Sequence, residues 1–463
     1  MKTTKRVISA VLALLTALSL SAPVFADTGM QDAAVEIGAA QAVAQEVSIQ
    51  ASSQTYGGNV LAAVNTRFST ETSYKGYFTS KADDAQSSVP SANGSTDEQT
   101  GIIDIYTDPD TGETFRVREP ELPELPEPTR NIPANADSSS AAAEPAAYST
   151  GSTRILKSVF DDNKIHNISM KCLYTGTYCT VWGSTSDNSS IRINASQAAQ
   201  IGQQFDSTIQ QERNAFGSYW CDTDGDGKVA IMCYDIDGEY GQSVGTYTAG
   251  YFFSRDLINR SGYINSHYFG SSYYLNGLDC IHIDTYPGMG TNLNNISRCY
   301  STLTHEFQHM INFSYCVKGS SYLSSMETYL NEAFSMASEH MILGSSATSS
   351  RISYFNSSSY IKGSPLTYWN GTLSNYSNSY LFGQYIRTRY AQTGRDGNTI
   401  YKTVLERRSN SNSDTLGIIA DLLSTSKKQL ILDFWTAVAV RKSSGKYGFN
   451  GESWANSIEI PYS

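Results

Sequence analysis

The residues best suited to chemistry in this chain are two histidines and a glutamate within the run THEFQH, residues 304–309. In a helix, His305 and His309 lie on the same face, one turn apart. Both imidazoles can then reach one zinc ion at about 2.0–2.1 Å. Glu306 directly follows the first histidine, where its carboxylate can act as the base toward a zinc-bound water. Only six histidines occur in the whole chain, so we interpret the pattern as a zinc site.

A catalytic zinc site needs three protein ligands and one open position, so a third ligand must lie elsewhere. One class of zinc enzymes supplies it by continuing the motif as His-x-x-Gly-x-x-His, and this chain lacks that glycine and that last histidine. The other common ligand is a glutamate on a following helix, for which Glu327, Glu332 and Glu339 compete. Glu332 has the spacing for a loop and an antiparallel return helix, whereas Glu327 lies too near the start of that helix. Glu339, two turns beyond Glu332, either orients a ligand histidine or lies on a solvated face.

Two stretches around these residues resemble a known group of enzymes. Residues 305–313 (HEFQHMINF), followed by residues 330–335 (LNEAFS), are similar to the gluzincin metallopeptidases. The closer resemblance is to the hyicolysin-type secreted neutral proteases of bacteria, and it extends from about Cys221 to Tyr385. The zinc motif is its most specific part.

The resemblance implies a zinc endopeptidase in which Zn²⁺ is held by His305, His309 and Glu332, with Glu306 as the general base. It also implies an α+β fold of the gluzincin (thermolysin-like) type: an N-terminal mixed β-sheet with the HExxH helix, followed by a mostly helical C-terminal lobe. Thermolysin-like enzymes carry an acidic residue four positions after the glutamate ligand, where this chain has Met336. The residue that orients the histidines must therefore come from elsewhere.

A further donor to the reaction's oxyanion is expected beyond the glutamate ligand, because zinc proteases of this class commonly place a tyrosine or histidine there. Tyr380 stands at such a position and is our candidate catalytic residue. The chain has 31 tyrosines, so a purely structural role in the core is the alternative. Residues 354–378 are candidates for the loops that select substrate side chains.

The N-terminus has the features of an export signal over residues 1–26. Basic residues come first, an apolar run covers residues 7–20, and a small residue, Ala26, ends the segment. The apolar run is shorter than a membrane span, and we find no later run of about 18 apolar residues. We therefore expect a secreted, extracellular protein without membrane anchoring.

Residues 27–152 differ in composition from the rest of the chain. They are rich in Ala, Gln, Ser and Thr, and then in Pro and Glu, with six of the 12 prolines falling between Pro120 and Pro145. Such a segment buries little apolar area. We expect a propeptide with a Pro/Glu-rich linker, and a surface spacer is the alternative. The catalytic domain is then residues 153–463.

The pattern of hydrophobic residues in that domain predicts strands first and helices later, which is typical of an α+β protein. The expected hairpin covers 168–183, the expected strands 229–236, 248–253 and 280–284, and the expected helices 195–214, 380–391, 416–423 and 429–440. All seven cysteines fall in this part. Cys172 and Cys179 flank a turn and are able to pair in an oxidising compartment, with buried free thiols as the alternative.

A second metal site is suggested by the run DTDGDG, residues 222–227. Asp222, Asp224 and Asp226 place carboxylates at alternate positions, and glycine permits the sharp bend of a calcium loop. The glutamate usual at the twelfth position is absent, so Asp235 or Asp237 would have to supply further oxygens. An acidic turn that binds no ion is the alternative to Ca²⁺.

The overall charge limits the partners. A formal net charge of −11 argues against nucleic acid and against anionic membranes. We expect protein or peptide substrates and a monomer. The alternative function is a secreted surface-binding or adhesive protein with a structural zinc site, which the high Tyr, Ser and Asn content would suit. Glu306 favours the enzyme, because a structural zinc site has no use for a base there.

Overall fold

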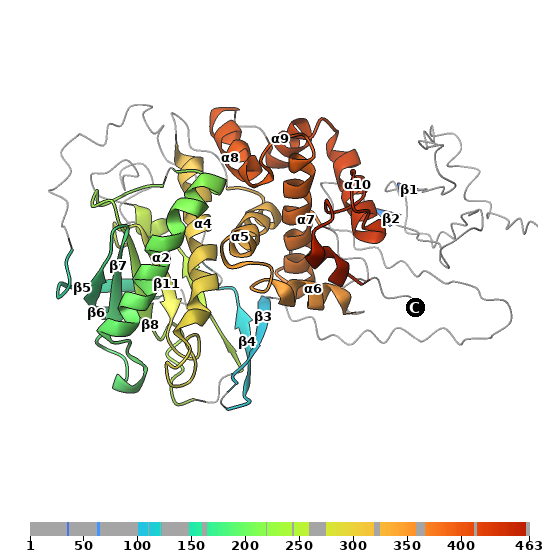
Figure 1. Cartoon of the computed structure of the whole chain (residues 1–463). Coiled ribbons are helices and arrows are strands. Elements are labelled where there is room, and N and C mark those ends of the chain that lie inside the picture. Colours follow the sequence, from blue (N-terminus) through green and yellow to red (C-terminus); the bar gives the residue numbers. More distant parts are fainter. Residues whose placement is uncertain are drawn as a thin grey trace, which may run out of the picture.

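The computed structural model (Figure 1) describes most of the chain from residue 101 onward and two short strands before it. The described residues are 35–36, 63–64, 101–109, 111–120, 122, 148–159, 164–218, 220–242, 245–258, 275–318, 325–357, 366–411 and 414–459. The predicted export signal, residues 1–26, lies outside them, as does most of the predicted segment 27–152, so both assignments stay predictions. Within the described part of the chain, no helix is both long and apolar enough to cross a membrane.

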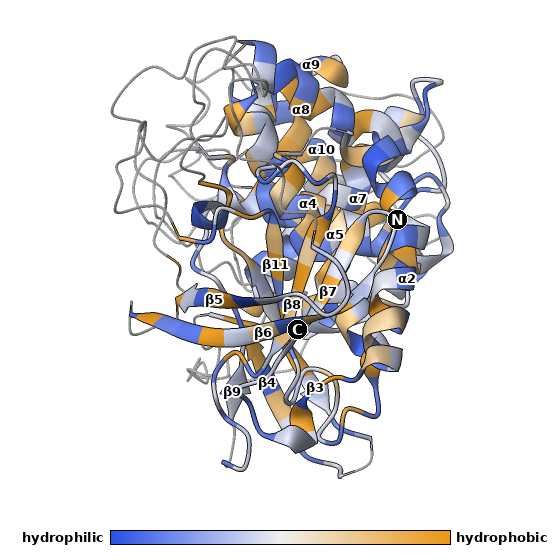
Figure 2. Cartoon of the chain, turned by 90° about the vertical axis from the view of Figure 1, so that its left-hand side faces the viewer, coloured by the Kyte–Doolittle hydropathy of each residue, from blue (hydrophilic) through white to orange (hydrophobic). Residues whose placement is uncertain are grey.

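A six-stranded mixed sheet forms one half of the molecule. Its strands, in spatial order, are β10 (Gly250–Phe252), β11 (Cys280–Asp284), β8 (Val229–Tyr234), β7 (Cys179–Ser184), β6 (Ile165–Thr175) and β5 (Thr153–Val159). The strands β11, β8 and β7 run parallel at the centre, and antiparallel strands flank them on both sides. Central parallel strands are covered on both faces, which explains why every residue of β8 is buried. Figure 2 shows the resulting concentration of hydrophobic residues along β8 and β11.

Alternate residues of these strands enter two separate cores, because successive side chains of a strand point to opposite faces. In β8, Val229 and Ile231 pack with helices α2 (Ala195–Phe216) and α4 (Cys299–Val317) on one face. Ala230 and Met232 pack on the other face, against residues of β5 and β6. The helix α4 therefore lies directly on the sheet and is buried along its middle turns.

The other half of the molecule is helical. It contains α5 (Thr328–Leu343), α6 (Ser349–Asn356), α7 (Leu373–Ala391), α8 (Ile400–Ser411), α9 (Thr415–Leu422) and α10 (Lys427–Val440). The helix α5 packs against α4 on one side and α7 on the other, so it joins the two halves (Figure 1). The predicted α+β class with a mixed sheet is confirmed, and the specific gluzincin arrangement stays a prediction.

A small three-stranded sheet is built partly from the predicted N-terminal segment. Its strands are β3 (Ile102–Thr107), β4 (Thr114–Arg118) and β9 (Thr246–Tyr247). A separate pair, β1 (Val35–Glu36) with β2 (Ala63–Val64), is parallel. Residues 101–118 therefore pair, through β9, with the part of the chain that was predicted as a separate domain, residues 153–463.

Several element boundaries differ from the sequence predictions. Of the predicted strand 248–253 only β10 is a strand, and the short strand β9 ends before it at Tyr247. The predicted helix 380–391 is only the later part of α7. That helix begins at Leu373 because its first turn is capped by Thr372 and Asn375, whose Oδ1 accepts the Thr372 N–H at 3.3 Å. Asparagine at this capping position is not the Glu or Gln that marks a helix start in sequence.

All seven cysteines lie in the described residues, and all are free and buried. The possible pairing of Cys172 with Cys179 is wrong. The two thiols lie in the cores on opposite faces of the sheet, so the alternative of buried free thiols holds.

Candidate active site

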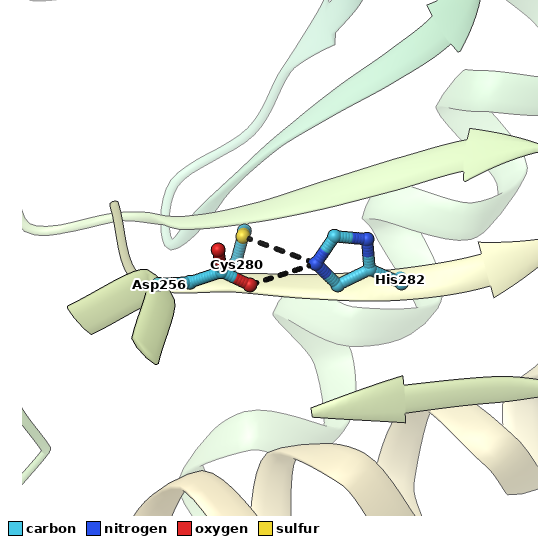
Figure 3. A group of neighbouring side chains, drawn as sticks. All are labelled: Asp256, Cys280 and His282. Atoms are coloured by element: carbon cyan, nitrogen blue, oxygen red, sulfur yellow. Dashed lines mark hydrogen bonds and ion pairs between the residues drawn. The ribbon is translucent and has the colours of Figure 1, made fainter. Parts of the chain in front are cut away.

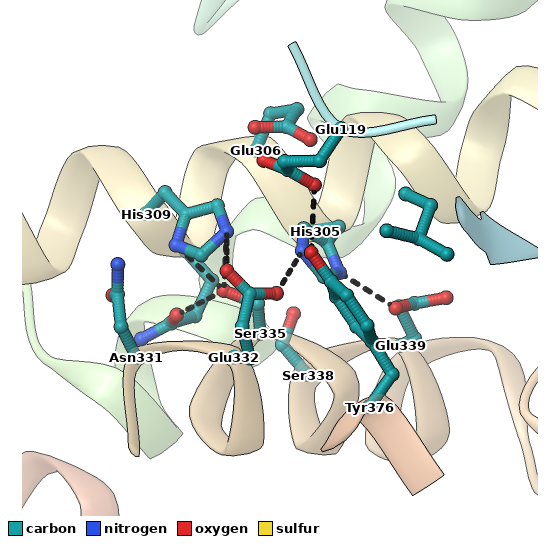
Figure 4. A network of polar contacts seen from close by, with 12 residues as sticks. Glu119, His305, Glu306, His309, Asn331, Glu332, Ser335, Ser338, Glu339 and Tyr376 are labelled. Carbon is teal, nitrogen blue, oxygen red and sulfur yellow. Dashed lines mark hydrogen bonds and ion pairs between the residues drawn. The ribbon is translucent and has the colours of Figure 1, made fainter. Parts of the chain in front are cut away.

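Helices α4 and α5 bring the three predicted zinc ligands together (Figure 4). One ligand atom each from His305, His309 and Glu332 lies within 4.8 Å of the others. The Glu332 carboxylate lies 3.2 Å from His305 Nε2 through one oxygen and 3.4 Å from His309 Nε2 through the other. Two imidazoles and one carboxylate that converge in this way are the donor set of a catalytic zinc site. The residues present therefore fit the ion that the sequence predicts.

The electrostatics of this group are those of a site that requires positive charge. Burial alone would lower the pKa of His305, but its contacts with Glu332 and Glu339 raise that pKa well above its ordinary value. Burial would raise the pKa of Glu332, yet His309 and His305 hold it far below its usual range. The carboxylate thus favours positive charge at the histidines, and a divalent cation bound there would supply it in place of protons.

Each histidine also has a contact at its Nδ1 atom. Glu339 Oε1 lies 2.7 Å from His305 Nδ1, and Ser301 donates its hydroxyl to the same carboxylate. Ser335 Oγ lies 3.0 Å from His309 Nδ1. The sequence left two roles open for Glu339, contact with a ligand histidine or a place on a solvated face. The structure shows the contact with a histidine. Such partners fix the ring orientation and tautomer of metal-binding histidines.

The candidate base, Glu306, lies between α4 and the edge of the large sheet. Its Oε2 accepts the N–H of Phe252, in edge strand β10, at 2.8 Å. The side chain is buried, and burial raises its pKa above the ordinary value. A raised pKa brings a carboxylate closer to the neutral range in which a general base works best.

The structure does not bring Tyr380 to this group. Its hydroxyl lies 2.9 Å from His340 Nδ1, in a fully buried contact next to Trp454. Another tyrosine of α7, Tyr376, reaches the site one turn earlier (Figure 4), and the negative charge of Glu332 is among the causes that raise its pKa. The sequence missed Tyr376 because the predicted helix began after it.

A residue of the N-terminal segment, Glu119, also reaches the site. Its Oε2 accepts a hydrogen bond from the Tyr376 hydroxyl at 3.0 Å. Burial, together with the charges of Glu332 and Glu306, raises the pKa of Glu119 to about 7. Figure 4 shows the Glu119 and Glu306 carboxylates on the same side of His305. Nothing in the composition of the Pro/Glu-rich stretch signals that one of its glutamates is placed here.

The predicted calcium ligands are only partly brought together. Asp222 and Asp224 lie with Asp279, a residue that the sequence analysis did not single out, and their ligand atoms are within 4.8 Å of one another. Asp226 is outside this group, because its carboxylate accepts the N–H of Lys228 at 2.8 Å. The structure also places the two alternative oxygen sources elsewhere. The Asp235 carboxylate accepts backbone N–H groups of its own loop, and that of Asp237 pairs with Arg118.

A third group of ligand-type residues lies in the core on the opposite face of the sheet (Figure 3). Asp256, Cys280 and His282 are fully buried, with ligand atoms within 4.8 Å of one another. His282 Nε2 lies 2.9 Å from Asp256 Oδ2, and His282 Nδ1 lies 2.9 Å from the Tyr234 hydroxyl. Both ring nitrogens are therefore engaged by the protein itself.

The first of these groups has the donor set of a catalytic zinc site, and comparison with known proteins finds a similar protein named as a metalloprotease. No protein-family model matches the chain. Over 305 residues the chain is 35% identical to a protein named Neutral metalloprotease ShpI from Staphylococcus hyicus. The aligned part is 64% of this chain and 64% of the relative, so the chain spans under two thirds of that protein's length. The predicted resemblance to the hyicolysin-type metallopeptidases is confirmed.

Proposed function

We propose that the protein is a secreted zinc-dependent endopeptidase that acts on proteins or peptides. The observation that carries the proposal is the convergence of His305, His309 and Glu332 beside a buried Glu306. The similarity to a neutral metalloprotease supports the same activity. The alternative, an adhesive protein with a structural zinc site, leaves the placement of Glu306 unexplained.

Zinc bound by the three ligands would lower the pKa of a water molecule and polarise the substrate carbonyl. Glu306 takes a proton from the attacking water and then delivers it to the leaving nitrogen. Tyr376, when free of Glu119, donates its hydroxyl to the carbonyl oxygen as negative charge develops there. Glu339 and Ser335 hold the two histidines in place. The edge strand β10, whose Phe252 N–H donates to Glu306, is at the edge of the sheet, where an extended substrate could pair with it.

The decisive test replaces Glu306 with glutamine, which keeps the shape of the side chain and removes the base. Casein cleavage should fall by about 10²–10⁴-fold, the range that a general base contributes, while zinc remains bound. The control is Glu406→Gln, which alters an exposed glutamate on α8. Zinc is measured per chain by metal analysis. Full activity of Glu306→Gln would refute the role of Glu306 as the base. No metal-dependent cleavage even by a chain in which Glu119 is replaced by alanine would favour the adhesive alternative.

We also propose that Asp222, Asp224 and Asp279 bind Ca²⁺ for stability. Among the described residues, both Asp224 carboxylate oxygens and Oδ1 of the fully buried Asp279 are buried without a hydrogen-bond partner. Burial and the neighbouring charges of Asp226 and Asp222 raise the pKa of Asp224 to about 7. Unpartnered buried carboxylates are costly, and a hard cation with oxygen ligands would satisfy them.

Calorimetric titration with Ca²⁺ tests this second site. Asp279→Asn should weaken Ca²⁺ binding and reduce the rise in melting temperature that Ca²⁺ produces, while zinc content stays unchanged. Asp235→Asn, which alters a carboxylate outside the group, is the matched control. Equal Ca²⁺ affinity in the Asp279 variant and the unmodified chain would contradict the proposal.

A further inference from the structure

Residues 101–120, which we call the strap, cross from the sheet half of the molecule to the helical half. On the sheet side, β4 pairs in parallel with β9, and Phe115 is buried against Tyr247. Arg118 forms a 2.6 Å ion pair with Asp237. The strap is thus docked on β9, and the chain continues from β9 into β10, the edge strand that contacts the candidate base.

Contacts with the helical half fix the other side of the strap. The Gly101 N–H donates to the Gly371 carbonyl at 2.6 Å, just before α7. On α6, the Tyr354 hydroxyl donates to Asp104 at 2.7 Å, and Arg351 donates to the Ile103 carbonyl. Because the metal ligands come from α4 and α5, between the two halves, a strap anchored on both sides passes over them.

At the end of this crossing, Glu119 turns its carboxylate toward the site. Its own N–H donates to the Gly101 carbonyl at 3.0 Å, which holds the backbone, and its Oε2 accepts the Tyr376 hydroxyl at 3.0 Å. Tyr376 is fully buried among these groups. A substrate carbonyl that needs the Tyr376 hydroxyl must therefore displace Glu119 first.

We propose that the strap is a built-in inhibitor, in which Glu119 occupies the substrate's place and engages the oxyanion donor Tyr376. This inference rests on the proposed peptidase function. The strap is joined to the rest of the catalytic unit through the Pro/Glu-rich stretch that begins at residue 118. Cleavage in that stretch would leave the strap held only by the contacts described above, so that it can dissociate and open the site.

The first experiment measures hydrolysis of a fluorogenic peptide by the full chain, with its uncut length verified by intact mass. Glu119→Ala should raise kcat/KM of the uncut chain by about tenfold or more, since a hydrogen bond to a charged group has that order of effect. Phe115→Ala, which loosens the strap far from the metal ligands, should act in the same direction. Glu113→Ala, at an exposed position of the same hairpin, should have no effect.

A second measurement does not depend on turnover. In a Glu306→Gln background, which keeps the chain uncut, calorimetry compares the binding of a peptide hydroxamate with and without Glu119→Ala. We expect about tenfold tighter binding without the Glu119 carboxylate. Unchanged binding, or a loss of activity in Glu119→Ala, would overturn the strap proposal. Tighter binding by a chain that never cleaves peptides would instead refute the peptidase function and leave the strap's blocking role standing.

Discussion

Two of the histidine-containing groups among the described residues have the composition of a metal site, and they differ in what their polar atoms face. In the α4–α5 group, the Nε2 atoms of His305 and His309 converge on Glu332 at 3.2 Å and 3.4 Å. In the sheet group, His282 bonds Asp256 with one nitrogen and Tyr234 with the other. In the first arrangement two ring nitrogens share one carboxylate, and a cation could bind all three groups. In the second arrangement each nitrogen of the histidine already has its own hydrogen-bond partner.

The elements explain this difference. Cys280 and His282 are two apart on β11, so both point into the same core, where neighbouring strands surround them. The histidines of α4 are one turn apart, and residues of α5 contact their Nδ1 atoms, while their Nε2 atoms share the Glu332 carboxylate between the two helices. Ligand type and proximity alone do not define a metal site. The direction in which the second ring nitrogen of each histidine points, and the group that it contacts, also matter.

The largest predicted effect comes from removing one carboxylate in each group. Loss of a residue that supports a metal ligand costs about 10–100-fold in activity. Glu332→Ala removes a ligand itself, so it should lose zinc and reduce peptide cleavage by more than that. Asp256→Asn should keep one zinc per chain and normal activity, and lower the free energy of unfolding by about 1–3 kcal/mol, the cost of a broken buried hydrogen bond. Metal analysis, activity and denaturant unfolding measure the three quantities. Loss of zinc in Asp256→Asn would break the distinction between the groups.

A smaller effect separates the two tyrosines of α7. Tyr376→Phe should lower kcat by about 10²-fold with little change in KM, because an oxyanion donor acts mainly in the transition state. Tyr380→Phe is the matched control: its hydroxyl contacts His340, so activity should stay within about twofold while stability falls by about 1 kcal/mol. The activity must be measured on chain cut after the strap, where Glu119 no longer engages Tyr376. Equal kcat values for the two variants would remove Tyr376 from the mechanism.

The parts of the site that could be predicted from sequence are those set by local geometry. His305, Glu306 and His309 lie within two turns of one helix, so its periodicity brings them near one another. Glu332 lies on the next helix, and it was assigned from its spacing and from the family resemblance. The α+β class was readable for the same reason, since strand and helix periods differ.

The missed residues depend on contacts between distant segments. Asp279 meets the Asp222 loop only because β11 pairs with β8, and Glu119 reaches the site only because β4 pairs with β9. Tyr376 was missed through local chemistry, because an asparagine completes its helix cap. The contact of Asp279 with the Asp222 loop and the contact of Glu119 with the site cannot be predicted from the periodicity of the sequence.

The smallest predicted effect extends the comparison to a fourth buried histidine, His340, whose Nδ1 contacts the Tyr380 hydroxyl. Burial, with a smaller contribution from the charge of Arg387, lowers its pKa to about 4, in contrast to the raised pKa of His305. The unfolded chain, with a histidine pKa near 6.5, then binds more protons than the folded chain between about pH 6.5 and pH 4. Stability should therefore fall as the pH falls through this window.

Between pH 7.5 and pH 5.5, His340 should remove about 1 kcal/mol of unfolding free energy, since one pKa unit corresponds to about 1.4 kcal/mol. His340→Gln cannot titrate and keeps an acceptor for the Tyr380 hydroxyl, so its stability should be less dependent on pH by that amount. Denaturant unfolding at both pH values, with saturating zinc in every sample, isolates the difference, because loss of zinc at the lower pH affects both chains alike. An identical slope in the two chains would show that His340 has the same pKa in the folded and the unfolded chain, and a buried histidine would then not need a carboxylate partner to carry charge.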